Sequence, residues 1–85
     1  MKSFDYVIND KLGIHARPAG LLVKLVSKFS STIELSLGDK KADPKRLFAL
    51  MGLGVKQGDK VTISANGADE DMAISEIEAF FKENL

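Results

Sequence analysis

Apolar residues alternate strictly with polar ones in some segments of this chain and recur with helical spacing in others. This pattern constrains the fold more than any other feature of the sequence. Alternation indicates a half-buried strand, as at Phe4, Tyr6 and Ile8, whereas apolar residues that recur with helical spacing indicate an amphipathic helix. The patterns predict strands over residues 2–8, 32–37, 40–42 and 61–65, and helices over residues 16–29, after Asp43 and after Asp69. The expected inner faces of these helices are Leu21, Leu22, Leu25, Val26 and Phe29; Leu47, Leu50 and Met51; and Ala73, Ile77, Phe80 and Phe81.

Turn and cap residues lie between these segments. Gly38-Asp39 is a two-residue hairpin signal, so the second and third strands are expected to pair. Asp43-Pro44 predicts an N-cap followed by the first helical position, and Asp69 predicts the N-cap of the last helix. Strands and helices alternate with no linker and no repeat. We therefore expect one domain over residues 1–85 with the order βαββαβα, an α+β open-faced β-sandwich in which three helices cover one face of a four-stranded antiparallel sheet.

The segment at residues 13–19, GIHARPA, contains the only histidine of the chain. Pro18 favours the first turn of a helix, which places His15 at or just before the N-cap. The first N–H groups of a helix have no partner within it and carry the positive end of its dipole, so they attract anions. A neutral imidazole is a nucleophile, and Arg17 offers a fork that fits phosphate oxygens. The residue types predict a reversible phosphohistidine at His15.

Simpler interpretations of His15 exist. A histidine at a helix start is often only a cap or a solvated surface residue. The chain has one histidine and no cysteine, which disfavours a zinc or transition-metal site, and we expect no metal and no cofactor. A serine–histidine hydrolase would need a third orienting group and a pocket, neither of which the pattern requires.

Composition excludes several classes of protein. Twelve basic and twelve acidic residues give zero formal net charge, whereas nucleic-acid binders usually show a basic excess. The N-terminus lacks the apolar core of a signal peptide, and no apolar run approaches the length of a membrane span. We expect a monomeric cytoplasmic protein that neither binds nucleic acid nor inserts into a membrane.

The GIHARPA segment resembles the active-site signature of HPr, the histidine-containing phosphocarrier family of the bacterial phosphotransferase system. The stretch from Lys45 to Asp71, KRLFALMGLGVKQGDKVTISANGADED, is similar to the second half of these proteins, so the resemblance extends over nearly the whole chain. It implies that enzyme I, charged by phosphoenolpyruvate, phosphorylates Nδ1 of His15. His15 then passes the phosphoryl group to sugar-specific enzyme IIA components, so the protein is a covalent relay rather than an enzyme with its own turnover.

The resemblance also implies roles for other residues. Arg17 would neutralise the phosphoryl group, and the N–H groups of Ala16 and Arg17 would help to hold it. Partners would dock on a surface around the histidine, made of Gly20, Lys24, Leu47, Phe48 and Met51. From the residues alone, Leu47 and Met51 are equally compatible with core packing, whereas Phe48 lies off the inner face and favours the interface.

Three positions are noteworthy. Arg46 stands where HPr proteins of low-GC Gram-positive bacteria carry the serine phosphorylated by HPr kinase/phosphorylase, so no regulatory serine is expected. Arg46 also places positive charge near a helix start, which an upstream cap at Asp43 would offset. Leu12 replaces the small polar residue of many members, and Gly20 lies inside a helix at a cost of up to about 1 kcal/mol relative to alanine.

Two rival functions belong to other classes. One is an HPr-like regulatory protein of nitrogen or catabolite control that acts through binding alone. The known example, the HPr-like regulator of carbon catabolite repression, lacks the active histidine and keeps the regulatory serine. This chain has the reverse pattern. The other is a true enzyme, which the absence of a second catalytic group disfavours.

Overall fold

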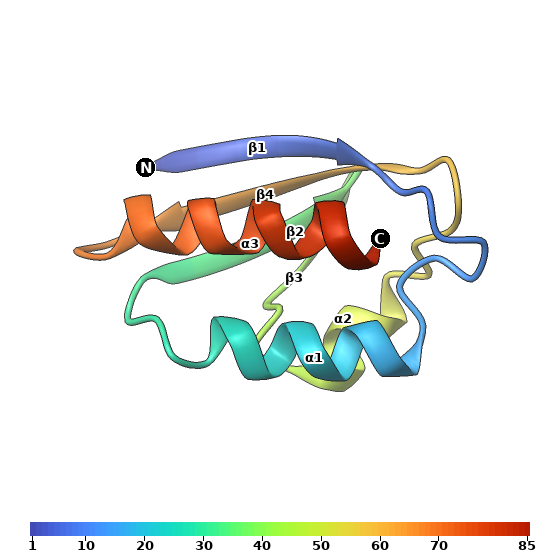
Figure 1. Ribbon diagram of the computed structural model, residues 1–85, viewed down its shortest axis with the longest axis horizontal. Coiled ribbons are helices and arrows are strands. Elements are labelled where there is room, and N and C mark those ends of the chain that lie inside the picture. The colour runs from blue at the N-terminus through green and yellow to red at the C-terminus, as the bar shows by residue number, and fades with distance from the viewer.

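The computed structural model describes all of residues 1–85 and contains four strands and three helices. Their order is β1 (Lys2–Val7), α1 (Ala16–Val26), β2 (Thr32–Leu37), β3 (Lys40–Ala42), α2 (Leu47–Gly52), β4 (Lys60–Asn66) and α3 (Glu70–Asn84). The strands form one antiparallel sheet in the order β1-β4-β2-β3, and the helices lie on one face of it (Figure 1). The predicted α+β open-faced sandwich and its element order are confirmed.

The sheet register follows from the alternation of side chains. Phe4 pairs with Ile63, and Leu35 pairs with Ile63 from the other side, so apolar residues of three strands share the covered face. A one-residue slip would expose this whole set to water, which makes the register well determined. The opposite face carries the hydroxyl and charged residues, including Asp5, which accepts a hydrogen bond from the Thr62 hydroxyl at 2.6 Å.

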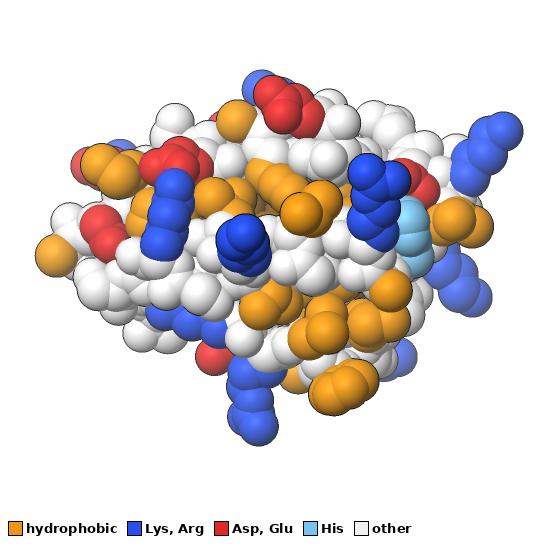
Figure 2. All heavy atoms as spheres, turned by 60° about the horizontal axis from the view of Figure 1, so that its bottom comes forward, with side chains coloured by type: hydrophobic (Ala, Val, Ile, Leu, Met, Phe, Trp, Pro, Cys, Tyr) orange, Lys and Arg blue, Asp and Glu red, His pale blue; other side chains and the backbone are white.

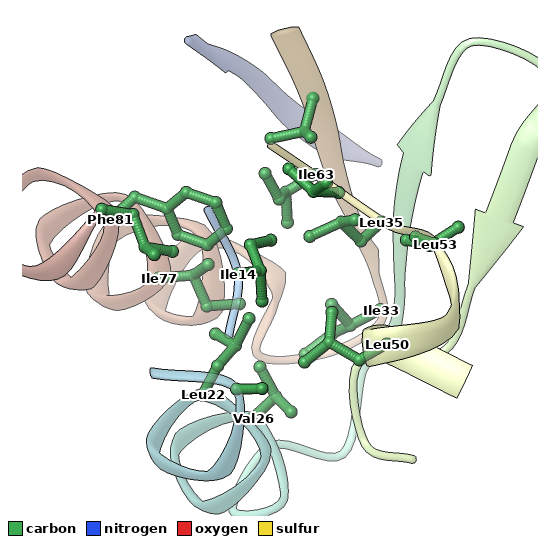
Figure 3. Packing of buried hydrophobic residues seen from close by; sticks show 14 of the residues in the cluster. Ile14, Leu22, Val26, Ile33, Leu35, Leu50, Leu53, Ile63, Ile77 and Phe81 are labelled. Atoms are coloured by element: carbon green, nitrogen blue, oxygen red, sulfur yellow. The ribbon is translucent and has the colours of Figure 1, made fainter. Parts of the chain in front are cut away.

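The core lies between the sheet and the helices. Leu22 and Val26 from α1, Leu50 from α2, and Ile77 and Phe81 from α3 converge on the apolar face of the sheet (Figure 3). Phe81 also makes edge-to-face contacts with Phe4 and Tyr6, at ring-centroid distances of 5.8 and 5.5 Å. None of the helices is both long enough and apolar enough to cross a membrane.

The first helix is shorter than its apolar pattern predicts. It ends at Val26, with Ser27 as the C-cap, rather than at Phe29. Phe29 is nevertheless buried, because the loop after the helix turns it into the core. Leu21, expected on the inner face, is 46% exposed. The buried positions at the start of the helix are instead Pro18 and Ala19.

The predicted start of the second helix is wrong. Asp43 and Pro44 form a turn, in which the Lys45 N–H donates to Asp43 Oδ1 at 2.9 Å. Helix α2 begins at Leu47, with Arg46 as an N-cap that makes no side-chain hydrogen bond. Asp43 therefore stabilises the turn and does not cap the helix. The upstream helix start that was expected to offset the positive charge of Arg46 is absent.

The apolar residues of α2 do not all face the core. Only Leu50 is fully buried, whereas Leu47 and Met51 are exposed. A helix of six residues has room for little more than one inward-facing turn. The expectation that all three residues form an inner face is wrong.

Asp69 occupies the predicted N-cap position of α3, but its side chain does not cap that helix. Its carboxylate accepts hydrogen bonds from the Ser30 and Ser31 N–H groups, both at 2.9 Å, and from the Ser31 hydroxyl. These bonds, the Ser31 hydroxyl first, lower the pKa of Asp69 to about 2. Asp69 thus ties the loop after α1 to the start of α3. On the same helix, Phe80 is only partly buried.

Candidate functional site

The site is built around His15, which is the N-cap residue of α1. Its backbone is extended, with φ −89° and ψ −178°, and its carbonyl accepts the Ala19 N–H at 2.9 Å. The imidazole makes no capping hydrogen bond, and the residue is half-buried. The ring is therefore held at the helix start but remains accessible from solvent.

The residues just before His15 fix its position. Ile14 is buried in the core (Figure 3). Its N–H donates to the Val55 carbonyl at 3.3 Å. Gly13 packs against the same segment so closely that a Cβ atom there would lie 2.2 Å from Val55 O and 2.8 Å from Lys56 Cα. Its φ of +65° also favours glycine. Gly13 is thus required by both space and backbone angle.

The start of α1 offers donors to an anion. The N–H groups of Ala16 and Arg17 occupy the first two helical positions, where a helix supplies no acceptor, and no side chain caps this helix. The guanidinium of Arg17 takes part in none of the ion pairs of the molecule. Ala16 and Arg17 follow His15 directly in the chain, and Arg17 lines the same cavity as His15.

An open cavity of about 310 Å³ lies at this point, and residues from three parts of the chain line it: Asp10, His15, Arg17, Pro18, Leu21, Glu83 and Asn84. The loop after β1, the start of α1 and the end of α3 meet there (Figure 1). The cavity places acidic and basic side chains around the imidazole, which is a setting for a charged group rather than for an apolar ligand.

The sequence interpretation missed Asp10, Glu83 and Asn84. Asp10 Oδ1 lies 3.7 Å from His15 Nε2. Asp10 could have been found from the sequence, because it places a carboxylate five residues before the only histidine. Glu83 and Asn84 lie about seventy residues from His15 along the chain, and no local pattern connects them with it.

The residues of the expected docking surface are exposed. Gly20 and Lys24 are exposed on α1, which packs against α2. We call Leu47, Phe48 and Met51 the α2 patch; their exposed fractions are 36%, 86% and 38%. Figure 2 shows hydrophobic side chains gathered on the same face as the single histidine. Exposed apolar side chains that gather in this way mark an interaction surface more often than isolated ones do.

Known proteins resemble the whole of this arrangement. Residues 2–83 match the family model described as PTS HPr component phosphorylation site. The phosphocarrier protein HPr of Mycoplasma capricolum subsp. capricolum is 43% identical over 77 residues, which is 91% of this chain and 86% of that protein. The solved structure of a mycoplasma histidine-containing phosphocarrier protein is 39% identical, with a TM-score of 0.94, and the match covers 96% of this chain and 93% of that one.

A solved structure of Crh, a catabolite repression protein of Bacillus subtilis, is also similar. It is 34% identical, with a TM-score of 0.78, and the match covers 100% of this chain and 98% of that one. It is described as an intertwined dimer with a swapped domain.

Proposed function

This chain belongs to the HPr family of the phosphotransferase system, and we propose that it carries a phosphoryl group on His15 from enzyme I to enzyme IIA components. The observation that carries the proposal is the position of an accessible imidazole at the uncapped start of α1. A nucleophile in that place has anion-binding groups beside it before any phosphoryl group arrives.

The chemistry follows from the neighbours of the ring. The imidazole attacks the phosphorus of the donor, and the phosphoryl oxygens then meet the N–H groups of Ala16 and Arg17 and the Arg17 guanidinium. A fork of N–H donors matches two phosphate oxygens at once. Because His15 and Arg17 are solvent-accessible, these contacts stabilise the phosphoryl group without enclosing it, as a relay requires.

We propose that partners dock over the α2 patch together with Gly20 and Lys24. Phe48 is the strongest candidate, since an aromatic side chain that is 86% exposed gains the most apolar contact when a partner covers it. The positive charge of Lys24 favours encounter with an acidic partner surface. The chain acts as a substrate of enzyme I and a donor to IIA, and has no turnover of its own.

A regulatory protein that acts only by binding is the alternative, because Crh shares the fold. Two residues argue against it. His15 is present and accessible, and position 46 holds an arginine, which has no hydroxyl for a kinase to phosphorylate. We propose that the chain is a monomer, for which light scattering after size-exclusion chromatography is the test; a dimer there would link it instead to the swapped arrangement of Crh.

The experiment that tests the proposed function is incubation with enzyme I and phosphoenolpyruvate, followed by intact-mass measurement. The expected product carries one acid-labile phosphoryl group. His15→Ala should remain folded and unlabelled, because the imidazole contributes little packing. Residual labelling of that variant would show that His15 is not the acceptor.

A further inference from the structure

Asp10 is held in a defined orientation beside the imidazole. Its Oδ1 accepts the Leu12 N–H at 2.8 Å, and its own N–H donates to the main-chain oxygen of Leu85 at 2.9 Å. Its carbonyl accepts the Gly13 N–H at 3.0 Å. Three hydrogen bonds therefore fix this residue, and they leave its carboxylate 3.7 Å from His15 Nε2.

The carboxylate faces one particular nitrogen of the ring. In a neutral imidazole one nitrogen carries the proton and the other carries the lone pair, and the hydrogen-bond partner of one nitrogen decides between the two tautomers. An acceptor-only carboxylate near Nε2 favours the proton on Nε2. The lone pair is then on Nδ1, away from Asp10.

We propose that Asp10 is a positioning residue for phosphoryl transfer, which selects the Nε2–H tautomer of His15 and balances the positive charge of the phosphorylated ring. This inference rests on the proposed function of His15, and it adds Asp10 as the residue that sets the protonation of the ring before transfer. The same logic operates wherever a carboxylate orients a histidine that acts through its other nitrogen.

The transfer step can be written with its charges balanced. The Nδ1 lone pair forms a bond to the phosphorus of a phosphorylated donor protein, and the donor's bond to phosphorus breaks, with its electron pair returning to the donor atom. The proton stays on Nε2, so the ring becomes cationic. Asp10 faces that cationic edge, while Arg17 and the first N–H groups of α1 are available to the phosphoryl oxygens. Onward transfer to IIA reverses these changes.

Other charged groups line the same cavity, so their roles must be separated. Arg17 comes from α1 and Glu83 from α3. Arg17 is a cation and offers the ring no acceptor, and Glu83 makes no close contact with His15, whereas Asp10 Oδ1 lies 3.7 Å from His15 Nε2. Both side chains in that pair are about one-third exposed, at 34% for His15 and 29% for Asp10. Water therefore weakens the interaction, and a charge pair at this distance in a water-like dielectric corresponds to an effect of about three- to tenfold on a rate.

The test combines a tautomer measurement with a rate. Nitrogen-15 NMR of the imidazole, under conditions where the ring is neutral, reports which nitrogen carries the proton and needs no partner protein. The variant Asp10→Asn keeps an oxygen for the Leu12 N–H, and this is the same oxygen that faces Nε2, but the variant removes the negative charge. Because a neutral amide oxygen is a weaker acceptor than a carboxylate, we expect this variant to weaken the preference for the Nε2–H tautomer and to slow transfer from enzyme I by about three- to tenfold.

Asp43→Asn is the matched control, because Asp43 Oδ1 accepts the Lys45 N–H two residues later, at 2.9 Å, in the same kind of turn. It should change neither the tautomer nor the rate. A proton on Nδ1 in the unmodified protein would overturn the inference even if Asp10→Asn failed to fold. An unchanged tautomer and rate in a folded Asp10→Asn would also overturn it, while labelling of the unmodified chain by enzyme I would still support the proposed function.

Discussion

Gly13→Ala tests how the fold places His15. Alanine at this position meets two penalties that are distinct in origin. The first is the backbone angle, since a φ of +65° costs a non-glycine residue about 1–2 kcal/mol. The second is the close approach to the segment that contains Val55, whose carbonyl oxygen would lie 2.2 Å from the new Cβ.

The second penalty can be estimated from what must move. Val55 is 5% exposed, and its carbonyl accepts the Ile14 N–H, so relieving the clash disturbs a core side chain and a backbone hydrogen bond. Overpacking of this kind costs about 1–3 kcal/mol, and the weakened hydrogen bond adds about 1 kcal/mol. We expect Gly13→Ala to lose at least about 3 kcal/mol in total, which lowers the melting temperature by roughly 12 °C or more for a domain of this size.

Gly38→Ala provides the matched control. Gly38 has a φ of +59°, close to that of Gly13, but a Cβ there would meet nothing within 4 Å. It therefore carries the backbone penalty alone, so the difference between the two variants isolates the clash. Thermal and urea unfolding of both variants, with labelling by enzyme I in parallel, gives the comparison. We expect Gly13→Ala to be less stable than Gly38→Ala and to be labelled more slowly, because the displaced Ile14 shifts His15. Equal stability of the two variants would refute the packing argument.

Three further predictions follow from the charges and the exposed surface. Arg17→Lys keeps the charge but loses the fork, so transfer to and from His15 should slow with little change in stability; equal rates would show that only charge matters. Phe48→Ala should leave the melting temperature within a few degrees of the original, because the side chain is 86% exposed, yet weaken docking to enzyme I about fivefold or more, and normal binding in a titration would place the interface elsewhere. Asp69 has a pKa lowered to about 2 from its usual 3.8, so its ionised form stabilises the fold fully above about pH 4, and this contribution is lost as the pH falls through about 2. Asp69→Asn should therefore be less stable at neutral pH, and its free energy of unfolding should change less between about pH 4 and about pH 2 than that of the unmodified protein. An unchanged loss of stability in this pH range would show that the Asp69 carboxylate is not responsible for it.

Most of the fold could be predicted from local patterns because they report directly on which side of an element is buried. Phe4, Tyr6 and Ile63 alternate with polar residues, and a strand on one layer of helices must bury every second side chain. Likewise, Pro18 after a histidine marked the start of α1, because proline suits only the first turn of a helix. The phosphoacceptor candidate was therefore visible without any coordinates.

The tertiary structure decided what local patterns leave open. Asp43-Pro44 has the residue types of a helix start, yet the chain makes a turn there and begins α2 three residues later, at Leu47. Asp69 has the residue type of a cap, but the N–H groups of Ser30 and Ser31 offer its carboxylate better partners from another loop. Competing hydrogen-bond partners of this kind lie far away along the chain. The local preference of a residue for a cap or a turn therefore cannot predict which partner it binds.

The sequence by itself determined the helix start and predicted the candidate nucleophile His15 and its arginine, Arg17, because these residues are close together in the chain and their chemistry is local. Only the tertiary structure decided that the end of α3 closes one side of the site and that Asp10 faces Nε2 of the ring. It also decided that Leu47 and Met51 are exposed beside Phe48 rather than buried. The physical reason is the same in each case: burial and pairing depend on which distant segments the packed core brings together, and that outcome belongs to the whole chain.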